Sequence, residues 1–289
     1  MAASELGRRV AFGLVAAPLV VIVVYLGDAP LAALLAIAAA LAAWEFFRIA
    51  ATASYAPLSG LGITIAALLP LVVHATYLGL VQPRLSWLAA GALLLFTAAL
   101  LTRGPAERPI GATASTLLGI VYTGGMLSFG YALRYHPYAV GKAAGAALLA
   151  FPVVLTWTSD TGGYFVGRAV GRRKLMPSVS PGKTVEGALG AMLLCVLVSW
   201  LFVRFVLVPY AQLGMTTGRI VIFAVIVSAA VQIGDLCESL IKREAGVKDS
   251  SRIIPGHGGV LDRLDGMIFA LPVAQLMLTA PHFLQPALR

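Results

Sequence analysis

Long apolar runs recur along almost the whole chain, and each is long enough for a helix to cross a lipid bilayer. A hydrocarbon core about 30 Å thick takes roughly 20 helical residues. Inside it every backbone N–H and C=O must be bonded within its segment, as an α-helix allows. We therefore predict an all-α polytopic membrane protein, a bundle of about nine transmembrane helices. The predicted spans are 10–27, 30–47, 58–80, 86–102, 111–133, 143–160, 187–208, 218–238 and 266–283.

Composition argues against a water-soluble domain. Hydrophobic residues make up 60% of the chain and charged residues only 11%, whereas soluble domains carry about 25% charged residues. The first apolar run follows Arg8 and Arg9, so a signal peptide is the alternative for it. Because that run is long enough to span and leads directly into the next one, we expect a retained first helix.

The distribution of Lys and Arg predicts the orientation. If the nine spans alternate from a cytoplasmic N-terminus, the cytoplasmic side receives fifteen basic residues and the other side six. This is the bias expected of membrane proteins. The net charge of +9 also admits nucleic acid, anionic lipid or a phosphorylated substrate as partner.

Two regions with different tasks are expected. Residues 1–142 form N-terminal transmembrane scaffold helices, rich in the small residues that let membrane helices pack closely. Residues 143–289 form the C-terminal catalytic transmembrane region of the same membrane unit. Within the scaffold, Glu45 stands three residues before Arg48. We expect a local ion pair between them, with a substrate role for Glu45 as the alternative.

Ionisable residues gather in two polar stretches of the second half, both predicted to be cytoplasmic loops. They run from Thr158 to Gly187 and from Gly234 to Asp265, and the second holds six of the twelve acidic residues. Ionisable groups in an otherwise apolar membrane protein usually mark its function. We therefore place the active site there, at the cytoplasmic face.

The acids of these stretches suit a metal ion. Asp262 and Asp265 are three residues apart, as are Asp235 and Glu238, so each pair shares a helix face. Carboxylates that converge at hydrocarbon depth repel one another and lose hydration, and a divalent cation relieves both costs. Oxygen ligands favour Mg²⁺ over Zn²⁺. We therefore predict that acids from this set, with Asp160 at the end of its predicted span, bind Mg²⁺. A second cation is left open, and helix capping is the alternative.

Basic residues and glycines accompany the acids. Mg²⁺ beside a basic cluster suits a triphosphate, whose charge needs both. The glycines around His257 can turn sharply and present backbone N–H groups to an anion. For residues 172–174, triphosphate binding and a topology signal combined with attraction to anionic headgroups are equally good explanations.

The motifs in these stretches resemble those of the phosphatidate cytidylyltransferases, or CDP-diacylglycerol synthases. The longer one comprises residues 239–243, 248–250 and 255–265, and the upstream one runs from Ser159 to Gly187. In detail the resemblance covers about residues 155–270. Two positions depart from it: Gly182 replaces a usual basic residue, and Gly266 stands where a small hydroxyl residue is common.

The resemblance implies that CTP and phosphatidic acid react, with Mg²⁺, to give CDP-diacylglycerol and pyrophosphate for phospholipid synthesis. The lipid phosphate would attack directly. Mg²⁺ on the triphosphate would be held by Asp235, Asp262 and Asp265, with Asp160 as a further ligand. The implied catalytic residues are Asp235, Lys248, Asp262, Arg263 and Asp265. The implied substrate-binding residues are Asp160, Arg168, Lys183, Glu186, Ser239, Lys242, Arg243, His257, Gly258 and Gly259. We expect a bacterial inner (cell) membrane protein that works in the bilayer, with a homodimer as candidate assembly and no nucleic-acid partner.

Two other functions are carried as alternatives. An ion-coupled transporter would place its acids near mid-helix and show internal repeats, whereas these acids collect at one face. A CDP-alcohol phosphotransferase would continue after Asp265-Gly266 with Ala-Arg and two further acids, which this chain does not.

Overall fold

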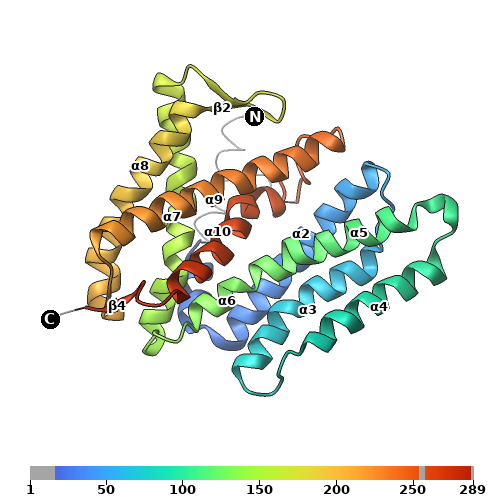
Figure 1. Ribbon diagram of the computed structural model, residues 1–289, viewed down its shortest axis with the longest axis horizontal. Helices are drawn as coiled ribbons and strands as arrows, with labels where there is room; N and C mark the ends of the chain where they lie inside the picture. The colour runs from blue at the N-terminus through green and yellow to red at the C-terminus, as the bar shows by residue number, and fades with distance from the viewer. Residues whose placement is uncertain (1–16, 254–257, 288–289) are drawn as a thin grey trace. The chain divides into compact units, whose positions relative to one another are not determined.

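The computed structural model describes residues 17–253 and 258–287, which are mainly helical (Figure 1). An apolar helix, Ala17–Leu26, comes first. The further helices are α2 (Asp28–Thr52), α3 (Ser59–Tyr77), α4 (Leu85–Thr102), η1 (Pro105–Glu107), α5 (Pro109–Ile120), η2 (Val121–Gly125), α6 (Phe129–Arg134), α7 (Gly141–Val170), α8 (Val185–Phe202), η3 (Val203–Ala211), α9 (Thr217–Glu244) and α10 (Leu261–Thr279). The strands are β1 (Lys174–Met176), β2 (Ser180–Thr184), β3 (Leu213–Gly214) and β4 (Gln285–Pro286).

The predicted all-α membrane fold is confirmed. Among the described residues, 7 helical segments are long and apolar enough to cross a membrane, and they correspond in order to the second to eighth predicted spans. The first predicted span is described only from Ala17. The last corresponds to α10, which carries Asp262, Arg263 and Asp265 near its start.

Two compact units divide the described chain. Of the described residues, the first contains 17–18, 28–131, 241–253 and 258–263, and the second contains 19–27, 132–240 and 264–287. Helices α9 and α10 therefore each contribute to both units. These units are defined by contacts within the fold. The predicted division at residue 142, between scaffold helices and a catalytic region, concerns function and stays a prediction.

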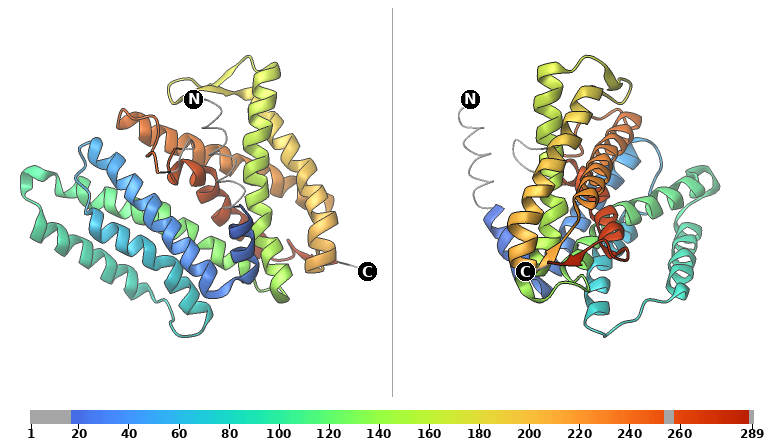
Figure 2. Two further views of the ribbon diagram at one scale, coloured as in Figure 1. Left: turned by 180° about the vertical axis from the view of Figure 1, so that it is seen from behind. Right: turned by 60° about the vertical axis from the view of Figure 1, so that its left-hand side comes forward.

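In the first unit, α2 packs along α3 (Figure 2). The buried rings of Phe46 and Phe47 lie at the centre of this packing. A side chain at Gly62 or Gly119 would overlap the Phe47 ring, so these glycines make room for it. The combination of small residues and large apolar ones thus lets these helices pack closely.

In the second unit, α7 and α8 pack through small residues. A Cβ atom at Gly187 would lie 2.8 Å from the carbonyl oxygen of Gly163 and 3.0 Å from the Cα of Gly167. Thr184 caps α8, because its hydroxyl accepts the Gly187 N–H at 3.1 Å. The backbones of the two helices therefore meet directly at the start of α8.

Both predicted loops need correction. Helix α7 continues past Asp160 to Val170, and the antiparallel hairpin of β1 and β2 follows, with Lys174 opposite Thr184. In the second stretch, α9 extends to Glu244 and α10 begins at Leu261. The physical reason is that a helix bonds its own backbone, whereas a loop in apolar surroundings would leave N–H and C=O groups unsatisfied.

Replacing Gly187 with Ala should destabilise the protein by about 1–3 kcal/mol, because the new methyl group overlaps the α7 backbone. Thermal unfolding of the purified protein in detergent would show a melting temperature lower by several degrees. Gly218→Ala is the matched control, since Gly218 also lies in the first turn of a helix and a Cβ there meets nothing within 4 Å. Equal melting temperatures for the two variants would contradict this account of the α7–α8 contact.

Candidate functional site

Most predicted site residues lie on α9, on α10 or in the segment between them. Helix α9 carries Asp235, Glu238, Ser239, Lys242 and Arg243, and α10 carries Asp262, Arg263 and Asp265. Lys248, Gly258 and Gly259 belong to the connecting segment, whereas His257 lies outside the described residues. The upstream candidates are Asp160 and Arg168 on α7, Lys183 on β2 and Glu186 in the first turn of α8.

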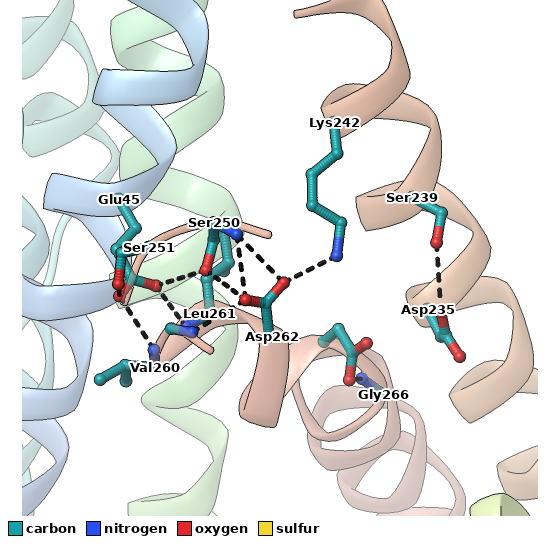
Figure 3. Close-up of polar contacts among 12 residues, drawn as sticks. Glu45, Asp235, Ser239, Lys242, Ser250, Ser251, Val260, Leu261, Asp262 and Gly266 are labelled. Carbon is teal, nitrogen blue, oxygen red and sulfur yellow. Dashed lines mark hydrogen bonds and ion pairs between the residues drawn. The ribbon is translucent and has the colours of Figure 1, made fainter. Parts of the chain in front are cut away.

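In the first unit, Asp262 is the centre of a group that we call the loop cluster: Glu45, Lys242, Ser250, Ser251, Gly258, Gly259 and Asp262. The Lys242 ammonium donates to Asp262 Oδ1 at 2.7 Å (Figure 3). The N–H groups of Ser250 and Gly259 donate to Oδ2 at 3.0 and 2.9 Å. Both carboxylate oxygens are therefore already bound by donors of the protein.

The glycines of the loop cluster are required sterically. Gly258 has a φ of +81°, a left-handed conformation that favours glycine. A Cβ atom there would lie 2.8 Å from Asp262 Oδ2, and one at Gly259 would overlap the Ser250 hydroxyl. The turn therefore folds closely around the protein's own carboxylates, and the Gly259 N–H that we predicted to face substrate binds Asp262 here.

Glu45 has other partners than the predicted one. Its buried carboxylate accepts hydrogen bonds from Ser250, Ser251, Val260 and Leu261 (Figure 3). The Arg48 guanidinium instead lies over the Trp44 ring, 4.7 Å from its centroid. In the sequence, the sign that Glu45 binds distant partners was its position inside a predicted apolar span. We had interpreted it as one half of a local ion pair with Arg48.

In the second unit, further acids form what we call the carboxylate cluster: Asp160, Asp235, Glu238 and Asp265, with Lys183 and Ser239. The Lys183 ammonium lies 2.5 Å from Asp235 Oδ2, and the Ser239 hydroxyl donates to Oδ1 at 3.3 Å. Asp265 shares a hydrogen bond with Glu238 and lies within electrostatic range of Asp235 and Asp160. The structure thus brings together six of the predicted polar residues, from α7, β2, α9 and α10.

Two glycines allow the approach of α9 to α10 at the carboxylate cluster. A Cβ atom at Gly234 would lie 2.5 Å from the carbonyl oxygen of Asp265. One at Gly266 would lie 2.8 Å from Val231 Cγ1. Gly266, the position that departs from the resembling family, is therefore explained by close helix packing.

The carboxylate cluster fits a hard divalent cation in part. Its donors are oxygens, and the neighbouring carboxylates repel one another electrostatically, which such a cation would relieve. Across residues 17–253 and 258–287, however, no three His, Cys, Asp or Glu side chains lie close enough to hold one metal ion. Mg²⁺ commonly uses only one or two carboxylates and completes its shell with water and substrate phosphate, so the donor set suits that mode.

The remaining candidates lie at the surface or support the backbone. Arg168 donates to the Tyr164 hydroxyl at 2.9 Å, one helical turn away. Glu186 accepts the N–H groups of Arg172 and Arg173 at 3.0 and 3.2 Å, so it holds the turn before the β1–β2 hairpin. Arg243, Lys248 and Arg263 are exposed.

A double-mutant cycle tests the Lys242–Asp262 contact. We expect Lys242→Met and Asp262→Asn each to lower the free energy of unfolding, and the double variant to lose less than their sum. The coupling should be roughly 0.5–3 kcal/mol, because the two side chains are only 13% and 10% exposed. Denaturant titration in detergent measures it, with the exposed Lys248→Met as control. Additive losses would show that the ion pair does not stabilise the loop cluster.

Comparison with known proteins agrees with the resemblance. The Cytidylyltransferase family matches residues 7–280. The phosphatidate cytidylyltransferase of Haemophilus influenzae is 44% identical over 140 residues, 48% of each chain. That of Staphylococcus epidermidis is 38% identical over 165 residues, 57% of this chain and 58% of the relative.

The Bacillus subtilis phosphatidate cytidylyltransferase is 40% identical over 136 residues, 46% of this chain and 48% of the relative. The chain thus spans about half the length of the curated relatives that it matches. The family match, in contrast, extends over nearly the whole sequence and includes both clusters. The chain therefore belongs to the Cytidylyltransferase family.

Proposed function

We propose that this membrane protein transfers the cytidylyl group of CTP to phosphatidic acid, with release of pyrophosphate and formation of CDP-diacylglycerol. The observation that carries the proposal is the family match across residues 7–280, with relatives named phosphatidate cytidylyltransferase. The two clusters on α9 and α10 support it, since they supply the acids and bases that a reaction between two polyanions needs.

The chemistry requires no general base. An oxygen of the lipid phosphate attacks the α-phosphorus of CTP, a new P–O bond forms, and the bond to the β-phosphate oxygen breaks to release pyrophosphate. A phosphomonoester has a second pKa of about 6, so the nucleophile is largely ionised at neutral pH. What the protein must supply is relief of charge repulsion and alignment of the two phosphates.

A divalent cation, which we propose to be Mg²⁺, would supply charge neutralisation and orientation of the triphosphate. We propose that Asp235 and Asp265 hold it, and that Asp160 becomes a further ligand only if the three side chains move closer together when the cation binds. Asp262 could join them only if its Oδ1 exchanged the Lys242 ammonium for the cation. Whether a second cation takes part is left to metal titration.

The bases would then bind phosphate oxygens. The Lys183 ammonium already lies beside Asp235, so it could bind a phosphate oxygen of a triphosphate whose metal ion is held by Asp235. Lys248 and Arg263 are exposed and reach outward from the segment around α10. We propose these three as phosphate-binding residues, with Arg168, Arg243, Ser239 and His257 as further substrate contacts.

The membrane setting follows from the substrates. Phosphatidic acid keeps its acyl chains in the bilayer, whereas CTP arrives from water, so the reaction belongs at a membrane surface. The excess of Lys and Arg on one side favours the cytoplasmic face. We propose a bacterial inner membrane location, a catalytic region in residues 143–289, and a homodimer as the candidate assembly.

Purified protein in detergent micelles should release pyrophosphate only when CTP, phosphatidic acid and a divalent cation are all present. Chelation by EDTA should stop the reaction, and added Mg²⁺ should restore it. Diacylglycerol in place of phosphatidic acid provides the matched lipid control, because it lacks the nucleophilic phosphate. Equal pyrophosphate release from both lipids, or full activity in excess EDTA, would contradict the proposal.

Asp235→Asn should lower kcat by about 100-fold or more, because the amide keeps the shape of the carboxylate but loses the charge that holds the cation. The midpoint of the Mg²⁺ titration should also rise. Glu107→Gln makes the same carboxylate-to-amide change at an exposed acid outside both clusters and serves as the control. Near-normal turnover of Asp235→Asn would exclude the metal-binding role of this residue.

A further inference from the structure

Glu45 is a buried acid that the reaction as described does not use. It lies on α2, and its exposed fraction is 0%. An ionised carboxylate is costly to bury unless donors satisfy its lone pairs. The sequence places it at residue 45, whereas the rest of both clusters comes from residue 160 onward.

The described donors to Glu45 come from the segment that joins α9 to α10 and from Leu261, the first residue of α10. Oε1 accepts the Ser251 hydroxyl at 2.5 Å and the Val260 N–H at 2.9 Å. Oε2 accepts the Leu261 N–H at 2.6 Å and lies 2.9 Å from the Ser250 hydroxyl oxygen. One carboxylate therefore accepts hydrogen bonds from residues 250 and 251 on one side of the α9–α10 connection and from residues 260 and 261 on the other.

The same contacts lead to Asp262. The Ser250 hydroxyl oxygen is 2.9 Å from Asp262 Oδ2 as well as 2.9 Å from Glu45 Oε2. Its single hydrogen can be donated to either carboxylate at one time. A Cβ at Gly259 would lie 2.5 Å from Glu45 Oε2, so the turn is packed against Glu45 too. Glu45, Ser250 and Asp262 thus form one continuous polar chain that ends at Lys242.

We propose that Glu45 is a positioning residue that holds residues 250–251 and 259–261, on the two sides of the α9–α10 connection, in the arrangement that binds CTP. It acts through Ser250, Ser251 and the backbone of Val260 and Leu261, and touches no substrate itself. The inference rests on the proposed function for the identity of the nucleotide. The segment carries Gly258 and Gly259 and is flanked by Lys248 and Arg263, so its conformation sets where these phosphate-binding groups stand.

The decisive variant is Glu45→Gln. It preserves shape, but its NH₂ group must face either the Val260 or the Leu261 N–H, which leaves a donor against a donor. In hydrogen–deuterium exchange of the full chain in detergent, we expect the amides of Val260 and Leu261 to exchange at least about tenfold faster than in the wild type. Amides of α3 should be unchanged. Glu107→Gln, the same change at an exposed acid, should resemble the wild type throughout.

Activity separates positioning from general stability. With CTP varied at saturating phosphatidic acid, Glu45→Gln should raise the KM for CTP about tenfold or more, while the KM for phosphatidic acid stays within about twofold. Ser251→Ala should give a smaller change of the same kind, and Ser251→Thr, which keeps the hydroxyl, should restore most of it. Ser251→Ala leaves the carboxylate in place, so it keeps the test decisive if Glu45→Gln does not fold.

The outcomes distinguish the two levels of inference. Unchanged exchange at Val260 and Leu261 would overturn the anchoring contact itself. Faster exchange with unchanged KM for CTP, or equal rises in the KM of both substrates, would overturn the positioning role. A wild-type protein that binds no CTP would contradict the proposed function and with it the assignment of the nucleotide, while the exchange experiment would still decide whether Glu45 anchors the segment.

Discussion

Burial of carboxylates in an apolar chain is the constraint on which the rest of this structure depends. Glu45 and Asp262 occupy the first unit, and Asp235 and Asp265 the second, on helices that are otherwise largely hydrocarbon. Such groups persist only where donors or cations satisfy them. The glycines at 234, 258, 259 and 266 allow the close approaches that this requires. The need to satisfy buried carboxylates therefore explains the positions of these glycines, the close packing of the helices and the chemistry of the site.

The two clusters satisfy their acids in different ways. In the loop cluster, Lys242, hydroxyl groups and backbone N–H groups bind both carboxylates, so the acids organise the protein. In the carboxylate cluster, Lys183 meets Asp235 while Asp265 is surrounded by other acids. The excess negative charge lies in the second cluster, which makes it the better place for a divalent cation. We therefore assign Asp262 to holding the loop cluster together, and Asp235 and Asp265 to binding the cation. The spacing of these acids in the sequence could not separate the two roles.

The sequence predicted the membrane fold and the family well, because apolar length and dense polar motifs are local properties. It placed α2 to α9 within a few residues at most ends, but ended the α7 span ten residues early, at Asp160 rather than Val170. The polar residues there suggested a loop, whereas backbone bonding favours helix. Glu45 was assigned to a neighbour three residues away, since its true partners lie more than 200 positions later. Contacts of that kind depend on tertiary packing and leave no trace in local spacing.

Direct attack of the lipid phosphate on CTP is the central claim, and the stereochemistry of transfer tests it most directly. CTP made chiral at the α-phosphorus by sulfur substitution would be reacted with phosphatidic acid, and the configuration of the lipid product determined. A single in-line displacement predicts that the labelled phosphorus enters the lipid with inversion. Retention would show two displacements and hence a covalent enzyme intermediate, and label that stayed in the water-soluble fraction would contradict cytidylyl transfer altogether.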